Sequence, residues 1–467
     1  MSPWIKSVKW LTQLIDKFRG KGIRLLGLNS VKLFGLILVS PIAVILRILG
    51  IRFSSGNHNQ RIGHLICEPL YMELQSRGNQ GLFKFFVVLI SGKDIANLAV
   101  LDAFPSNVVT IRNQWCCKFL FVFKFHPLTS VDMNRGVVAI SGAADVFKYS
   151  HLTSPDKPFL NIARRGDPKV DQLLSNLGVS DDGWYVCLHN RENGYSPSDD
   201  QTHSYRNASI SHFTLAVHYI HDLGGTIIRM GDSSMQKIEG NSLIIDYANS
   251  EFRSPENDLI LASNCRFFLG NSSGLLVVAE AQGIPCVGVN LAPAGAAKFW
   301  GPNDISVPKV YRRSVDDSIV SFQEVFDSRL ADYRFTSEFE KSGVYLQESS
   351  PDEILEACRE MMARFQGDRE RNTDNFLQNR FNQLFTKKII VIIHKQSSQH
   401  ISWINTKIIS SNSELRKHKN CFAANSNGLL KLLLSITRAI EILPTITIST
   451  SRIFEGCSCL ARKIIIC

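Results

Sequence analysis

Residues 254–290 have the sequence SPENDLILASNCRFFLGNSSGLLVVAEAQGIPCVGVN, and this stretch decides the fold. Apolar runs of strand length alternate in it with segments of helical composition, in the order helix 255–263, strand 266–269, turn 270–274, helix 275–282 and strand 285–289. Such alternation is typical of parallel strands joined by crossover helices. We therefore expect an α/β protein whose helices cover both faces of a parallel sheet.

The same alternation extends over residues 56–370. Strands are expected at 83–90, 108–111, 184–188, 226–230 and 242–246, and helices at 95–104, 209–223 and 350–365. Because the pattern occurs twice in tandem, we expect two Rossmann-like lobes, 56–175 and 176–370. The cleft between two such lobes is the usual place for a ligand.

The formal net charge of +10 on the 467 residues is distributed unevenly. Residues 1–61 have a net charge of +9 and residues 387–467 again +9, which leaves −8 on residues 62–386. A nucleic-acid-binding protein would carry its basic surplus on the folded core. The distribution therefore argues against nucleic acid and favours an anionic membrane surface as the partner of the basic ends.

Residues 1–55 are expected to associate with a membrane. Over 4–18, apolar side chains recur every three or four residues among basic ones, as in an interfacial helix, although such a helix could also pack on its own domain. The uncharged run 33–46 is too short to span a bilayer, and Ser40-Pro41 is expected to interrupt it because proline breaks the helical ladder, so a re-entrant or interfacial segment is favoured. Eleven cysteines without a C-x-x-C pair fit a reducing compartment. We expect a cytoplasmic protein, peripheral or monotopic at the inner face of the cell membrane.

The turn 270–274 is the strongest local motif. Its G-x-S-x-G pattern matches the nucleophile turn of α/β-hydrolases, but their triad needs a downstream histidine, and residues 222–393 contain none. The alternative is an anion site, in which backbone N–H groups and hydroxyls at a helix N-terminus hold a phosphate. Its members would be Asn271, Ser272, Ser273 and Gly274, with Glu280 further along, either reaching a ribose or staying on the surface. A capped turn without a ligand is the third interpretation.

The segment HNRENGY, 189–195, is the second motif, because it follows a predicted buried strand. Ligands of open parallel sheets collect at the carboxyl ends of the strands. Arg191 can hold a pyrophosphate through two hydrogen bonds, His189 could bond a phosphate or an acceptor hydroxyl, and Arg229 ends the next strand on the same side. A polar surface loop is the alternative. Three further residues are expected in the donor or acceptor cleft: Tyr205, Arg206 and Asn207.

Two residues are candidates for a catalytic base. His64 lies in the segment RIGHL, 61–65, where a glycine-containing loop before a helix could shape a pocket, although a lone histidine is more often structural. Asp200 is the second candidate. The chain contains no D-x-D and no G-x-x-x-x-G-K-[ST] motif, so neither a carboxylate-held metal nor a P-loop is indicated, and no cofactor is expected.

Five blocks of the sequence together resemble a bacterial family of glycosyltransferases. They are RIGHL with Glu68 and Tyr71 (61–71), WYVCLHNRENGY (184–195), HSYRNASI (203–210), GGTIIRMGD (224–232) and the stretch 254–290. The resemblance implies a GT-B-like fold and transfer of a hexose or deoxyhexose from a nucleotide-sugar donor to an envelope polysaccharide or a lipid-linked glycan. A nucleotide-sugar epimerase or hydrolase on the same fold, and a non-catalytic membrane-tethered sugar-binding protein, are the alternatives.

More remotely, the H-x-R segment and the block DLILASNCRFFLGNSS are similar to the GDP-fucosyltransferase-like branch of GT-B enzymes. That similarity implies that Arg191 binds the donor phosphate, that Ser272 and Ser273 line the donor site with His189 alongside, and that the reaction needs no metal. The resemblance does not cover residues 387–467. With a linker they form the segment 371–467, a basic tail rich in Ile, Ser and Lys that is expected to pack poorly. It could be a membrane-binding appendage, a disordered extension or a segment translated from an altered reading frame.

Overall fold

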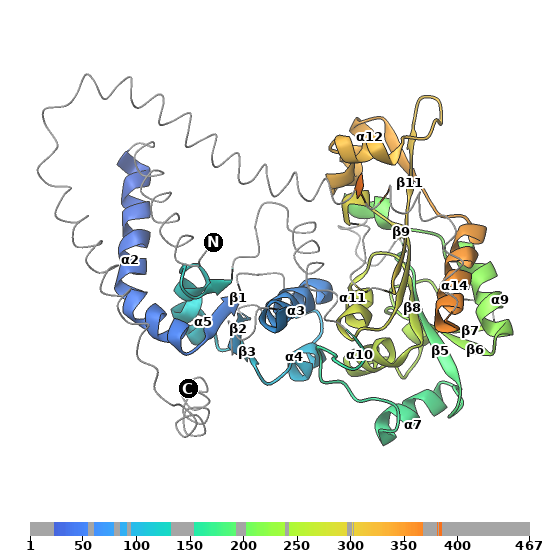
Figure 1. The fold of residues 1–467 in the computed structure, drawn as a ribbon, viewed down its shortest axis with the longest axis horizontal. Coiled ribbons are helices and arrows are strands. Elements are labelled where there is room, and N and C mark those ends of the chain that lie inside the picture. Colours follow the sequence, from blue (N-terminus) through green and yellow to red (C-terminus); the bar gives the residue numbers. More distant parts are fainter. Residues whose placement is uncertain are drawn as a thin grey trace, which may run out of the picture. The chain divides into compact units, whose positions relative to one another are not determined.

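The computed structural model describes residues 23–54, 60–78, 85–90, 95–131, 154–192, 202–238, 242–296, 301, 303–367, 381 and 383–384 (Figure 1). All of them belong to the first of the two compact units into which the chain divides, residues 1–389 and 390–467. The predicted helix over 4–18, Asp200 and the tail 387–467 lie outside the described residues.

A six-stranded parallel sheet forms the second lobe. Its strands are β5 (Trp184–His189), β6 (Gly225–Arg229), β7 (Ile244–Ile245), β8 (Phe267–Gly270), β9 (Cys286–Leu291) and β10 (Ile305–Pro308). They lie in the order β10-β9-β8-β5-β6-β7, and each neighbouring pair is parallel. The chain starts at the centre with β5, moves outward to β7, and returns to place β8 on the other side of β5. This is the Rossmann strand order, and the reversal between β5 and β8 is the switch point at which such sheets bind ligands.

Helices cover both faces of this sheet, because successive side chains of a strand point to opposite faces. The covering helices are α9 (Thr214–Asp222), α14 (Pro351–Phe365), α10 (Pro255–Asn264) and α11 (Gly274–Ala281). Val186 and Leu188 of β5 pack in the apolar cluster that contains α9 and α14, whereas Tyr185 and Cys187 pack in the cluster that contains α10 and α11. Figure 1 shows the two helix pairs on opposite sides of the strands. The α/β architecture with helices on both faces is thereby confirmed.

The first lobe contains a four-stranded parallel sheet in the order β3-β2-β1-β4. The strands are β1 (Ile51–Ser54), β2 (Phe85–Leu89), β3 (Val108–Ile111) and β4 (Ser130–Val131). Residues 51–54 were expected to belong to the membrane-associating segment, but they form an interior strand of this sheet. All four are buried, and the Arg52 guanidinium is retained inside by a 3.0 Å bond from Nη1 to the carbonyl oxygen of Ile51.

The apolar run 33–46 lies within one helix, α2 (Ile23–Ile48), and the expected interruption at Pro41 does not occur. A proline removes only one N–H from the helical ladder, and the bonds on both sides of it can persist. The preceding Ser40 hydroxyl adds a bond of 2.9 Å to the carbonyl oxygen of Leu36. Among the described residues, no helix combines the length and apolar character that crossing a membrane requires.

Further helices complete the first lobe and link it to the second. They are α3 (Ile62–Gly78), α4 (Ala99–Ala103), α5 (Gln114–Leu120), the 3-10 helix η1 (Phe121–Lys124) and α7 (Pro168–Asn176). Helix α3 packs against α11, and α4 packs against α10, so that one apolar cluster extends from the first sheet to the second. The strands β11 (Val310–Arg313) and β12 (Val344–Gln347) form an antiparallel pair. A smaller apolar cluster joins this pair to the helices α12 (Phe322–Asp327) and α13 (Thr336–Lys341).

Candidate functional site

The ends of β5 and β8 bring two of the sequence motifs side by side. His189 of β5 is paired with Gly270 of β8, so the segments 190–192 and 271–274 leave the sheet at the same edge. Only glycine permits this approach, because a Cβ at position 270 would lie 2.2 Å from the carbonyl oxygen of His189. The HNR segment (189–191) and the turn 270–274, which we call the serine turn, therefore meet at the switch point of the sheet.

Asn271 holds the two segments together. Its side chain is fully buried, its Oδ1 accepts a bond of 2.9 Å from the backbone N–H of Arg191, and its Nδ2 donates to Oδ1 of Asn190 at 3.3 Å and to the carbonyl oxygen of Arg206 at 3.2 Å. Its backbone N–H donates to the carbonyl oxygen of His189 at 3.3 Å. Asn271 is thus the buried centre of a network that positions two arginines.

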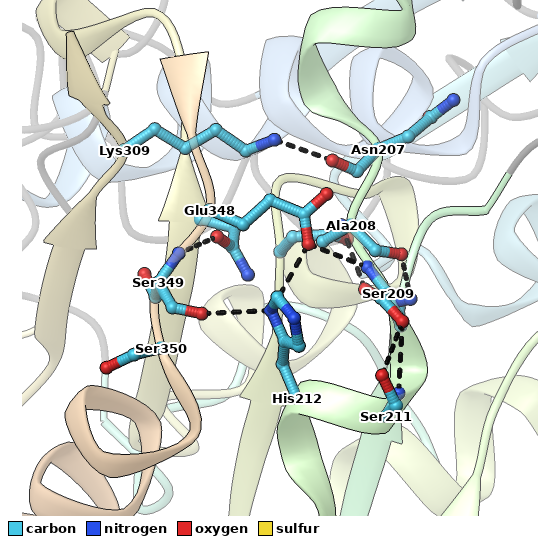
Figure 2. Close-up of polar contacts among 12 residues, drawn as sticks. Asn207, Ala208, Ser209, Ser211, His212, Lys309, Glu348, Ser349 and Ser350 are labelled. Atoms are coloured by element: carbon cyan, nitrogen blue, oxygen red, sulfur yellow. Dashed lines mark hydrogen bonds and ion pairs between the residues drawn. The ribbon is translucent and has the colours of Figure 1, made fainter. Parts of the chain in front are cut away.

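Three cationic side chains join this network: Arg191, Arg206 and Lys309. Nε of Arg191 donates to Oδ1 of Asn207 at 3.0 Å. Nη2 of Arg206 donates to the carbonyl oxygen of Ser272 at 2.7 Å and to its hydroxyl at 3.3 Å. Nζ of Lys309 donates to the carbonyl oxygen of Asn207 at 2.6 Å (Figure 2). Arg206 therefore lies against the serine turn, and Arg191 and Lys309 both bond to Asn207, the chain neighbour of Arg206.

Lys309 is a site residue that the sequence did not indicate. It follows β10, and its side chain is buried. Burial lowers the pKa of Lys309 to about 8, and the negative charge of Glu348 opposes that shift. Figure 2 shows the Glu348 carboxylate directed toward Ser209, whose backbone N–H donates to it at 2.9 Å, and toward His212, whose Nδ1 lies 3.3 Å away. A single lysine after a strand is too common a feature to be selected from a sequence.

The first turn of α3 meets the first turn of α11. A Cβ at Gly274 would lie 2.2 Å from Cγ2 of Ile62 and 3.2 Å from the backbone nitrogen of Gly63. At the same point the hydroxyl of Ser273 caps α11 by accepting a backbone N–H bond. His64 follows Gly63 directly and is half-buried. The candidate base of the first lobe and the serine turn of the second lobe are therefore carried by helix ends that touch.

Arg229 lies apart from the three cations. Its guanidinium is fully buried and forms ion pairs with Glu192 at 2.9 Å and with Asp246 at 3.0 Å. Two carboxylates compensate its charge, and the bond to Glu192 ties down the segment that carries Arg191. The structure therefore pairs Arg229 with two carboxylates, one of them on the loop after β5.

His189 is uncharged near neutral pH. Burial lowers the pKa of His189 to about 4, and the positive charge of Arg229 is the next largest cause. Its Nδ1 is buried and has no hydrogen-bond partner among the described residues. A neutral imidazole can exchange a hydrogen bond with a ligand, but with such a pKa it is a weak base.

Two other predicted site residues are turned into the protein interior. Tyr205 packs against Phe339 with ring centroids 5.1 Å apart, in the cluster around β11 and β12. Glu280 lies on α11, where it is only 6% exposed, and burial raises the pKa of its carboxyl well above the ordinary range. Burial raises the pKa of Cys67 on α3, and the neighbouring Glu280 adds to that shift. Glu280 is therefore not at the surface but between the two helices.

The second candidate base and the absence of a metal stay predictions. Asp200 lies outside the described residues. Within the parts of the chain that the structure describes, no group of three or more His, Cys, Asp or Glu side chains is arranged to hold a metal ion.

No family model matches the chain, and no curated protein matches it. Several solved structures of glycosyltransferases are similar to the chain. A glycosyl transferase of family 9 from Veillonella parvula DSM 2008 is 13% identical, with 55% of this chain and 83% of that chain covered and a TM-score of 0.36. The ADP-heptose lps heptosyltransferase II of E. coli is 12% identical, with 68% and 99% covered and a TM-score of 0.36. The E. coli heptosyltransferase WaaC with ADP is 9% identical, with 63% and 98% covered and a TM-score of 0.31. With TM-scores below 0.5, these similarities assign no function to this chain.

Proposed function

We propose that the chain is a glycosyltransferase that binds a nucleotide-sugar donor at the switch point between β5 and β8. The observation that carries the proposal is the network around Asn271, in which Arg206 bonds to Ser272 before the N-terminus of α11, while Arg191 and Lys309 bond to the adjacent Asn207. The phosphates of such a donor are anionic at neutral pH. Guanidinium, ammonium and helix N-terminal N–H groups are the groups that hold them in proteins.

The same cations would assist the chemistry. As the acceptor oxygen bonds to the anomeric carbon of the sugar, the bond from that carbon to the phosphate oxygen breaks, and negative charge grows on the leaving phosphate. Donors fixed in advance stabilise that charge without further reorganisation. Arg191 is oriented by Asn207, and Arg206 by Ser272, so both are arranged before a ligand binds. In this proposal they supply the charge that a divalent metal supplies elsewhere.

The acceptor hydroxyl must lose a proton as it attacks, and we propose His64 as the base. Its position in the first turn of α3 places it on the first lobe, beside the contact between Gly63 and Gly274. The acceptor would then approach from the first lobe, while the second lobe holds the donor. Asp200 is the alternative base.

The proposed acceptor is an envelope polysaccharide or a lipid-linked glycan. The enzyme would act at the inner face of the cell membrane, as a peripheral or monotopic protein. Support for this location comes from the basic excess of +9 at each end of the chain, which an anionic lipid surface attracts.

The proposal is tested by a thermal-shift screen of the full-length protein with nucleotide sugars of each common base, followed by product analysis. With the donor that binds, Arg191→Ala should lower turnover about tenfold or more, which corresponds to about 1.4 kcal/mol in the barrier. Arg313→Ala is the matched control, since Arg313 forms an exposed ion pair with Glu324 at 2.7 Å. Release of free sugar without transfer would identify a hydrolase, and donor binding without turnover a sugar-binding protein. Near-normal turnover of Arg191→Ala with every donor would refute the assignment.

A further inference from the structure

Large aromatic side chains are exposed on α5 and on η1, which follows it. Trp115 and Phe119 are 77% and 72% exposed and lie one turn apart on the same face of α5. Phe121 and Phe125 are also exposed, and their rings meet edge to face with centroids 5.0 Å apart. Single exposed apolar residues are ordinary, but a cluster of large ones marks a surface that contacts an apolar partner.

The outer face of α2 is apolar as well. Leu38, Ile42 and Ile45 recur at intervals of four and three residues, Ile48 extends the stripe, and all four are exposed. Ala43, on the opposite side of the helix, is fully buried. A helix on the surface of a soluble domain normally turns its apolar stripe toward the core. In α2 a second apolar stripe faces outward.

The elements that carry the two surfaces adjoin. Helix α2 contacts η1, the hydroxyl of Ser40 lies 3.3 Å from Nε2 of His126, which follows η1, and Figure 1 shows α2 beside α5. We name the combined surface the α2–α5 face and define it by its exposed residues Leu38, Ile42, Ile45, Ile48, Trp115, Phe119, Phe121 and Phe125.

The charges around the α2–α5 face are positive. The sequence contains no Asp or Glu in 17–67 or in 103–131, the segments that include α2, α5 and η1. Arg112 and Lys118 are exposed beside the aromatic residues, and Nζ of Lys118 lies 5.0 Å from the ring centroid of Trp115. Tryptophan and basic side chains next to aliphatic ones are the combination that anchors proteins at the interface of an anionic bilayer.

We infer that the α2–α5 face is the surface by which this protein docks on a bilayer containing anionic lipid, with Trp115 and Phe119 inserted at the level of the headgroups. The inference deepens the membrane location within the proposed function and rests on it, but it adds a contact outside residues 1–55. The face belongs to the first lobe, which also carries His64, the proposed base for an acceptor hydroxyl. A lipid-linked acceptor would therefore meet the lobe that is docked.

The experiment compares the full-length protein with the double variant Trp115→Ala/Phe119→Ala in sedimentation with phosphatidylcholine vesicles, with and without phosphatidylglycerol. The wild type should sediment with the anionic vesicles, and the double variant should lose about tenfold or more in apparent affinity. The matched control is Leu215→Ala/Leu223→Ala, which removes two exposed leucines at α9 and should bind like the wild type. Lys118→Glu should weaken binding to the anionic vesicles only.

Each other outcome overturns the inference. Equal sedimentation of the wild type and the double variant would show that the aromatic cluster does not contact lipid. Failure of the wild type to sediment, with self-association that the double variant abolishes, would make the face an interface between copies. Circular dichroism of the same samples shows whether the double variant is folded, and donor binding tests the glycosyltransferase proposal separately. Sugar transfer without vesicle binding would refute only the docking surface.

Discussion

The role of Asn271 gives the sharpest prediction. Asn271→Ala removes three side-chain hydrogen bonds, to the N–H of Arg191, to Oδ1 of Asn190 and to the carbonyl oxygen of Arg206. At about 1 kcal/mol for each bond, the free energy of unfolding should fall by about 3 kcal/mol. Because the same bonds hold Arg191 and Arg206 in place, the donor dissociation constant should rise about tenfold or more.

Two companion variants make the prediction specific. Asn271→Asp keeps the acceptor for Arg191 but replaces the donating Nδ2 with an oxygen and places a charge in a buried position, so it should be at least as destabilising as Asn271→Ala. Asn176→Ala is the control, since Asn176 is exposed on α7 and its side chain bonds only to Gln172 in the described structure. Its cost should stay within about 0.5 kcal/mol.

The assay is urea unfolding followed by circular dichroism, together with calorimetric titration of the donor. If Asn271→Ala unfolds at the same urea concentration as the wild type and binds the donor within about twofold of it, the network around Asn271 is not what positions the arginines.

Four further predictions follow from the site. Gly274→Ala would place a Cβ 2.2 Å from Cγ2 of Ile62, so it should lower the free energy of unfolding by about 1–3 kcal/mol and also lower turnover. Gly35→Ala is the control, because a Cβ there would have nothing within 4 Å. Equal melting temperatures of the two variants would contradict the packing argument. The pKa of Lys309 is lowered to about 8, so its charge is present below that pH, and donor affinity should weaken as the pH rises through it. Lys309→Arg should keep that affinity at high pH, and a wild-type affinity that does not change with pH would exclude Lys309 from the donor site. His64→Gln should lower kcat about a hundredfold or more with donor binding unchanged, and a normal kcat would leave Asp200 as the candidate base. Turnover should be the same with EDTA as with added Mg²⁺, and a loss in EDTA would contradict a reaction that relies on arginine and lysine alone.

Much of the second lobe could be predicted from local sequence, because its strands are continuous apolar runs and its helices carry clear caps. The predicted strand 184–188 and helix 350–365 correspond closely to β5 and α14. The strand β1 could not be predicted in the same way, since it has only four residues, includes Arg52 and is buried on both faces. The break expected at Pro41 was wrong, because a helix tolerates the loss of one backbone bond.

The site was only partly predictable, for a related reason. Arg191 and the serine turn could be expected together because both follow strands of one parallel sheet, whose carboxyl ends share an edge. That argument does not extend to Arg229, which also ends a strand but meets Glu192 and Asp246. Lys309 could not be predicted from the sequence, because a lysine is recognised as a site residue only when its burial and its neighbours are known.

The sequence by itself determined the alternation of strands and helices, the basic ends of the chain and the two motifs at strand ends, since each depends on residues close together along the chain. Only the tertiary structure decided that β8 returns beside β5, that Asn271 is buried between the backbones of two arginines, and that α2 packs against η1, which follows α5. These features depend on contacts between residues far apart in the chain. Such contacts are selected by packing and by the pairing of buried polar groups, neither of which is visible in a local pattern.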